Sequence, residues 1–212
     1  MDIDDFVELA SRGAIDEVQA ALEAGFDVNM ARDDGYTPLM LACEADSLEM
    51  VTLFLDRGAD VNVQDQDGFT ALIFAALNGY TDIVNELCLH SADVNIYNND
   101  DRGALYYAAE RGHLAIVKKL ILRGANIDAK DNTNKTPLMI AATWGHENVV
   151  EELCESHADV NLAANGGTTA LMLACDSDSL EIVRELCQYN VNVNAQKAVS
   201  YTHLTLPTIY SV

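Results

Sequence analysis

Apolar and polar positions repeat along this chain with a fixed interval of 33 residues. Around each repeat a short apolar segment with helical spacing is followed by a Gly or an Asp, a second apolar segment and a polar turn. The turn reads Asp-Val-Asn at 60–62, 93–95 and 159–161. A period of this length, with helix and turn signals at fixed offsets, predicts a solenoid of stacked helix pairs. The clearest marker of the interval is one leucine in each unit, at Leu39, Leu72, Leu105, Leu138 and Leu171.

Several longer motifs recur in the same register. They are Gly35-Tyr36-Thr37-Pro38-Leu39, Asn78-Gly79 with Ile83-Val84, Gly112-His113-Leu114 with Ile116-Val117, and Gly58-Ala59-Asp60-Val61-Asn62. These motifs resemble the ankyrin repeat family, and the resemblance covers roughly residues 1 to 197. It implies an all-α solenoid of stacked helix-turn-helix units with projecting β-turn or hairpin loops.

The register divides the chain into six units and a tail. We expect an N-terminal capping repeat at 1–30, repeats at 31–63, 64–96, 97–129, 130–162 and 163–197, and a non-repeat tail at 198–212. Asp2, Asp4 and Asp5 suit a helix start that faces water. Thr37 and Thr136 are expected to cap the helices that begin at the prolines after them.

Some units depart from the pattern. The third repeat reads Asp101-Arg102-Gly103-Ala104 in place of a capping threonine, which predicts a loss of about 1 kcal/mol there. Asp46 and Asp178 replace the glycine expected between the two helices, and Asp tolerates the left-handed region better than most residues. The histidine usual in the family after Pro-Leu is absent, so its turn-bridging hydrogen bonds are in doubt. Its place is taken by Met40, Ile73, Tyr106, Met139 and Met172.

The tail after Val199 has no repeat signal and no formal charge. Its string from Val199 to Thr208 resembles the in-frame translation of a transposase-type sequencing adapter, and we interpret it as an artefact that cuts the natural protein within its array. An ordinary disordered terminus is the alternative. A missing C-terminal cap would leave the face around Leu180, Val183 and Leu186 uncovered and prone to association, although we expect a monomer.

Composition narrows the class of function. The chain is 50% hydrophobic with a net charge of −22, so it can bury a core, and its field repels nucleic acid and anionic lipid while favouring basic partners. Seven of its 12 basic residues nevertheless fall between Arg102 and Lys135. The absence of a long apolar run argues against membrane insertion. The five cysteines recur at core positions, which predicts small buried side chains in an intracellular protein, cytoplasmic or nuclear.

No catalytic motif is present. The sequence has no Gly-x-Gly-x-x-Gly, P-loop, His-Glu-x-x-His or Cys-x-x-Cys. The histidines lie at repeat positions, and His113 and His146 match the family's Gly-His step, where the role is structural. We therefore expect no enzyme activity, no cofactor and no metal. The repeated asparagines are interpreted first as residues that hold the turns, with hydroxylation as a minor alternative, at Asn62, Asn95, Asn161 and Asn194.

In the resembled family, the turn tips and the concave side of the first helices contact partners. At these positions the chain varies its chemistry from unit to unit, as an adaptable recognition surface requires. Trp, Tyr and Arg carry interface energy most often. The candidate partner-binding residues are Tyr36, Phe69, Leu77, Asn78, Arg102, Glu110, Arg111, Lys135, Thr143 and Trp144.

The expected function is a non-catalytic protein–protein interaction module. Aromatic anchors around Arg102, Arg111 and Lys135 suggest an acidic, aromatic partner segment near the third and fourth repeats, with basic flanks over the acidic outer units. For Trp144 and Phe69, packing within the array is the alternative to partner contact. A second hypothesis is a targeting or regulatory array of a larger enzyme, channel or ubiquitin-ligase adaptor.

Overall fold

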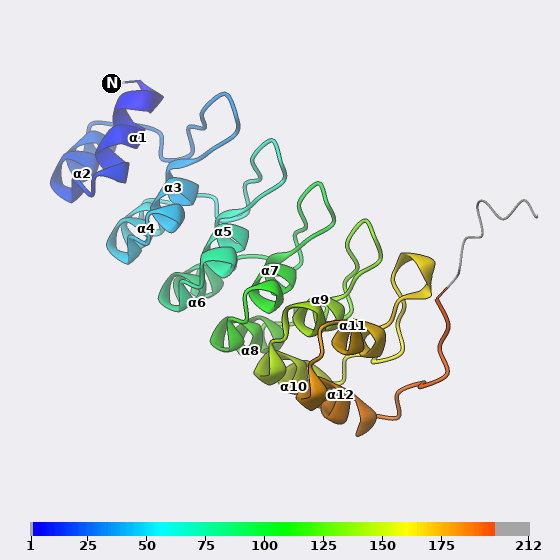
Figure 1. The fold of residues 1–212 in the computed structure, drawn as a ribbon. Coiled ribbons are helices and arrows are strands. Elements are labelled where there is room, and N and C mark those ends of the chain that lie inside the picture. Colours follow the sequence, from blue (N-terminus) through cyan, green and yellow to red (C-terminus); the bar gives the residue numbers. More distant parts are fainter. Residues whose placement is uncertain (1, 198–212) are drawn as a thin grey trace, which may run out of the picture.

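A computed structural model describes residues 2–197, which form two parallel rows of short helices with loops projecting from one side (Figure 1). Within this range the secondary structure is helical, and the only bridges are the isolated pairs Tyr97–Gly103 and Ala163–Thr169. The expectation of an all-α solenoid is confirmed. The helices are α1 (Ile3–Ser11), α2 (Ile15–Glu23), α3 (Pro38–Glu44), α4 (Leu48–Asp56), α5 (Ala71–Asn78), α6 (Thr81–Leu89), α7 (Ala104–Glu110), α8 (Leu114–Leu122), α9 (Pro137–Trp144), α10 (Glu147–Glu155), α11 (Ala170–Asp176) and α12 (Leu180–Cys187), with a 3₁₀ turn η1 (Asn165–Gly167).

The odd-numbered helices, here called inner helices, begin at hydroxyl caps. Thr37 Oγ1 accepts a hydrogen bond from the Met40 amide at 3.3 Å, and Thr70, Thr136 and Thr169 cap their helices in the same way. These bonds satisfy amides that the first helical turn leaves without a partner. Gly103, the N-cap of α7, makes no side-chain cap bond, as expected for the third repeat. At the start of the array Asp2 and Asp5 form a capping box on α1.

A tight reversal joins each inner helix to the even-numbered outer helix that follows. Gly79 has φ 84°, and Asp46 and Asp178 take the same left-handed conformation with φ 54° and 53°. At Gly79 an added Cβ would also lie 2.6 Å from the His113 ring of the next unit. Glycine is therefore required there for backbone conformation and for space.

The core runs without interruption along the array, because each helix pair packs on the pairs before and after it. Inner helix α5 lies between α3 and α7, and outer helix α10 between α8 and α12. One core position on the outer helices is fully buried in every repeat, at Phe54, Leu87, Leu120, Leu153 and Leu186.

The loops before the inner helices, here called fingers, are joined to one another by backbone hydrogen bonds. Each bond runs from an amide to a finger carbonyl of the preceding unit, as from Gln66 to Asp34 and from Asn99 to Asp67, both at 3.0 Å. In three fingers a side-chain oxygen accepts a hydrogen bond from the backbone amide four residues later and so closes the turn. These side chains belong to Asp65, Asn98 and Asp131. The fingers therefore hold a common register across the array.

A second ladder of hydrogen bonds lies in the segments that lead from each outer helix into the next finger. Asn29 Oδ1 accepts from the Asp60 amide at 2.7 Å, and Asn62 Oδ1 accepts from the Asp93 amide at 2.8 Å. Asn95 and Asn161 make the same bond to the next unit. These contacts account for Asn62, Asn95 and Asn161 as residues that hold turns and link neighbours.

Tyr106 corrects the expectation that hydrogen bonds bridging the turns are lost with the missing histidine. Its hydroxyl donates to Asp131 Oδ2 in the next finger at 3.3 Å, so this unit regains a bridging hydrogen bond without the missing histidine. Met40, Ile73 and Met139 at the same position are buried and apolar.

The last described unit corrects two expectations, one about the burial of the cysteines and one about the exposure of Leu186. Cys43, Cys88 and Cys154 are buried as expected, whereas Cys175 and Cys187 are exposed because no described unit packs over them. Leu186 was expected on an uncovered face, but it is fully buried. The interpretation of 198–212 lies outside the described residues.

A cap deletion tests the role of the finger hydroxyls. Thr70→Ala removes the acceptor for the Ile73 amide, so we expect the free energy of unfolding to fall by about 1 kcal/mol. Urea unfolding followed by circular dichroism measures the change. Thr52→Ala is the control, because that hydroxyl only bonds Leu48 within α4, and it should change stability by less than about 0.5 kcal/mol. Equal losses in both variants would contradict the cap assignment.

Candidate partner-binding site

The ten candidate residues lie in two rows on neighbouring units. Tyr36, Phe69, Arg102 and Lys135 stand at the bases of consecutive fingers, immediately before the cap position. The second row lies at the C-terminal ends of α5, α7 and α9, and consists of Leu77, Asn78, Glu110, Arg111, Thr143 and Trp144. The inner helices pack side by side, so these positions form one face, here called the finger-side face.

Trp144 is the most prominent apolar group of this face. Its side chain ends α9 and is 60% exposed, so the indole does not pack into the core. Arg111 occupies the same repeat position on the preceding unit and is also exposed. An exposed aromatic ring and an exposed guanidinium, which lies 3.9 Å from Glu110, thus stand at one position of consecutive units. Tryptophan and arginine are side chains that interface hot spots favour.

Tyr36 and Phe69 instead join a row of rings. The Tyr36 ring lies 5.2 Å from Phe74 on α5, and Phe74 lies 5.1 Å from Phe69. Phe69 is in turn 5.6 Å from Tyr107 on α7. Tyr36, Phe69 and Phe74 are half-buried, so the row supports the fingers and still presents ring edges to solvent.

Arg102 is less available than the sequence suggests. Its guanidinium lies 3.8 Å from Asp100 and 3.7 Å from Asp131, and it sits over the Tyr106 ring at 5.1 Å. The Nε atom is buried without a hydrogen-bond partner. Two carboxylates neutralise this charge. The less fully neutralised cations of the expected basic patch are Lys135 and Arg111, although Arg111 lies 3.9 Å from Glu110.

Asp131 organises the finger next to Arg102. Burial alone would raise the pKa of this carboxyl, but hydrogen bonds from Thr133 Oγ1 and from the amides of Lys135 and Thr133, together with Arg102, lower it below its ordinary value. The carboxylate therefore stays charged and fixes both the finger turn and the guanidinium.

The histidines have structural surroundings. The His146 ring lies against Gly112 and its Nε2 is 2.9 Å from the Glu110 carbonyl oxygen of the preceding unit. His113 lies against Gly79 in the same manner, and burial lowers the pKa of its imidazole. Burial also raises the pKa of the Cys43 thiol, and that of Cys154 to about 12, which leaves both unreactive.

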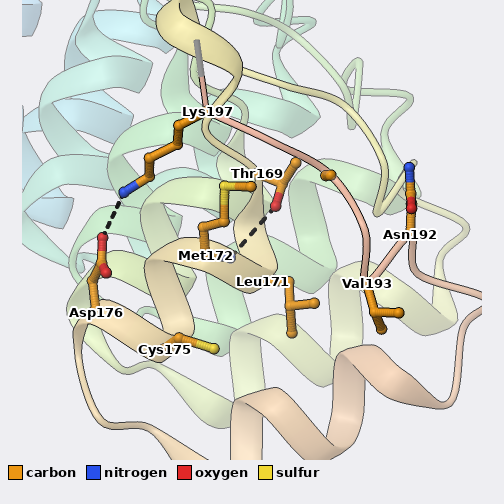
Figure 2. Close-up of a pocket in the computed structure, with 9 residues that line it drawn as sticks. Thr169, Leu171, Met172, Cys175, Asp176, Asn192, Val193 and Lys197 are labelled. Carbon is orange, nitrogen blue, oxygen red and sulfur yellow. Dashed lines mark hydrogen bonds and ion pairs between the residues drawn. The ribbon is translucent and has the colours of Figure 1, made fainter. Parts of the chain in front are cut away.

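A shallow cavity of about 280 Å³ lies over α11 in the last described unit (Figure 2). Leu171, Met172 and Cys175 line it from the helix, and Val193 lines it from the segment after α12. An ion pair of 3.0 Å between Lys197 and Asp176 closes one side. The lining is the inner-helix face that the next unit covers elsewhere in the array, so the cavity reflects repeat packing rather than a catalytic centre.

Within residues 2–197, no group of three or more His, Cys, Asp or Glu side chains is arranged to hold a metal ion. None of the helices in this range combines the length and the apolar character that crossing a membrane requires.

Comparisons with known proteins agree with the repeat fold. The model for ankyrin repeats in three copies matches residues 6–100, 46–131 and 105–197, which together span most of the chain. The chain belongs to the ankyrin repeat family. Ankyrin repeats generally serve as non-catalytic modules that bind other proteins, and the finger-side face is where this array varies. No curated protein matches the chain at a significant level.

A solved structure supports the fold of this ankyrin array over its length. The crystal structure of the human ASB11 ankyrin repeat domain matches with a TM-score of 0.82 at 25% sequence identity. The match covers 91% of this chain and 86% of the other.

Sequence reasoning missed Phe74 and Tyr107 in the ankyrin array. Both stand on the second turn of an inner helix, at the repeat position that holds Leu41 and Ile140 in other units. The sequence does contain a signal. The helix position is aromatic only in the two repeats that come directly after a finger with an aromatic base, which is Tyr36 for Phe74 and Phe69 for Tyr107. Only the stacking of units shows that the rings meet.

His113 predicts a pH dependence of stability. Its lowered pKa means that the unfolded chain binds the proton first, so stability should fall as pH drops below about 6.5. His113→Gln should make this decline less steep. The slope of the free energy of unfolding should change by less than about 1.4 kcal/mol per pH unit, which is the value for one fully coupled proton. Urea titrations between neutral and mildly acidic pH measure it. The exposed His157, replaced by Asn to suit its φ of 69°, should leave the decline unchanged. An unchanged slope in His113→Gln would contradict the assignment.

Proposed function

We propose that the chain is a non-catalytic interaction module that holds a partner protein on the concave, finger-side face of its stack and on the turn tips. The observation that carries the proposal is the 60% exposed Trp144 in a row of unit-by-unit varying side chains. Burying such a ring on a partner removes large apolar area from water at little cost in side-chain entropy.

The chemistry of the central units favours one kind of partner segment. Lys135 stands at the finger base of the unit that carries Trp144, and Arg111 occupies the position of Trp144 on the preceding unit. Thr143 and Asn78 add polar groups to the same row, and their side-chain oxygens can still accept hydrogen bonds. An acidic segment with an aromatic or aliphatic anchor would match this arrangement. Free buried thiols at Cys43, Cys88 and Cys154 suit the reducing interior of a cell, where we place the protein as a monomer that does not bind nucleic acid.

Replacing the tryptophan tests the proposal. Trp144→Ala should weaken capture of the natural partner by about 30-fold, corresponding to a hot spot of about 2 kcal/mol. Its melting temperature should stay close to that of the parent, because the indole is mostly outside the core. Quantitative affinity capture from cells of the source organism, with photo-crosslinking from position 143, gives the measurement.

Leu122→Ala provides the matched control. Leu122 ends outer helix α8 and is 80% exposed, so its loss also removes exposed apolar surface, but away from the finger-side face. Capture should persist in this variant. Equal weakening by both substitutions, or crosslinks from an outer position such as Glu151 in place of 143, would refute the proposed binding face.

A further inference from the structure

The row of rings on the finger-side face is partly exposed to solvent at its N-terminal end, which is formed by Tyr36 and Phe74. Tyr36 stands at the base of the first finger and Phe74 one unit further along, with their ring centroids 5.2 Å apart. Both side chains are half-buried, and the neighbouring finger-side positions Glu44 and Asn78 are exposed. Solvent, and hence a partner, therefore reaches aromatic carbon at this point.

Carboxylates surround this end of the row. The Tyr36 hydroxyl donates to Glu44 Oε2 at 3.3 Å, and its backbone amide donates to Asp34 Oδ1 at 3.1 Å. Burial, and after it the charges of Glu44, Asp65 and Asp34, raises the pKa of the Tyr36 phenol. The aromatic surface thus lies in a negative field that favours a cation.

The surrounding units supply few cations of their own. Residues 1–96 contain 20 Asp and Glu against three arginines and no lysine. Arg32 pairs with Asp34 at 3.4 Å, and Arg57 pairs with Glu23 on the outer helices at 3.4 Å. In the described structure Glu44 has no salt-bridge partner, although its side chain is exposed.

The third repeat contains a guanidinium held by a ring and carboxylates within the chain. Arg102 stands at the repeat position of Tyr36 and Phe69, and its guanidinium lies over the Tyr106 ring at 5.1 Å between two carboxylates. Ring and carboxylates thus hold a guanidinium within the chain itself. At the first two fingers this position carries a ring in place of the arginine, and Met40 and Ile73 stand where Tyr106 does, so the rings and the carboxylate there come from other positions and no arginine among the described residues covers them.

We propose that Tyr36, Phe74 and Glu44 form a docking site for an arginine side chain in a basic segment of the partner protein. The inference rests on the proposed interaction function and names the chemistry of one end of its surface. The guanidinium plane stacks on the exposed ring edges and faces while its N–H groups donate to the Glu44 carboxylate. Lysine fits less well, because an ammonium is more strongly hydrated and cannot stack.

Binding of defined peptides to the full chain tests the site. The probe is a short fluorescent peptide of alternating arginine and glycine, compared with versions that carry lysine or uncharged citrulline, at near-physiological salt. Fluorescence anisotropy should show the arginine peptide binding several-fold more tightly than the lysine peptide, and the citrulline peptide not binding. Equal binding of the arginine and lysine peptides would reduce the interaction to net charge and overturn the proposal.

Variants locate the site on the chain. Glu44→Gln and Tyr36→Leu should each weaken the arginine peptide by about five- to tenfold. Tyr36→Phe retains the ring and should bind within about twofold of the parent, which keeps the test decisive where the leucine variant unfolds. Asp56→Asn is the matched control, because it removes one exposed negative charge from the same helix pair at the end of outer helix α4. A loss in Asp56→Asn equal to that in Glu44→Gln would overturn the proposal.

The test of the arginine site and the test of the proposed function can fail independently. If the natural partner depends on Trp144 while no variant at Tyr36 or Glu44 changes the peptide affinity, the interaction module stands and the arginine site fails. If the peptide binds as predicted while Trp144→Ala leaves partner capture intact, the arginine site stands and the central binding face fails.

Discussion

Each helix pair in this array depends on its neighbours to bury its apolar side, and the rest of the structure follows from that dependence. Val51, Val84, Val117 and Val150 occupy one position of the outer helices and are fully buried, because the next unit covers them. Val183 holds the same position in the last described unit and is only half-buried. The residue type is constant, so the neighbour alone decides the burial. A single pair would expose this surface and could not fold independently.

Neighbour packing also explains why a recognition surface can vary without harm to the fold. The first two turns of the inner helices are buried on nearly all sides, as in α7 and α9. The positions that vary stand at the finger bases and at the C-terminal ends of these helices, where side chains are half-buried or exposed. Hydrogen bonds between consecutive fingers hold these positions in line, so a change such as Phe69 to Arg102 alters the chemistry of the face and not its geometry. The Arg102 guanidinium shows the limit of this independence, since Asp100 and Asp131 bind it within the array.

The sequence was sufficient for the fold and insufficient for part of the site. Thr37 and Thr136 follow local capping rules, and Asp46 takes a left-handed turn that depends only on its own backbone. Such features need no knowledge of neighbours, which is why periodicity predicts them. The exposure of Cys175, the ion pairs of Arg102 and the contact between Tyr36 and Phe74 depend on which units are adjacent and how they are rotated. A repeat pattern gives the order of units but not the side-chain distances between them.

The asparagine ladder has a consequence for how such a chain changes over generations. The bonds from Asn29 to Asp60, from Asn62 to Asp93 and from Asn95 to Asn126 span the same 31 residues, so each joint is equivalent to the next. Duplication or loss of a whole 33-residue block within a gene would restore the same joint on both sides of the change. A shift of a few codons would break two joints at once. Lineages that carry this array can therefore lengthen or shorten their recognition surface by whole repeats, while the side chains and the position of each remaining finger stay the same.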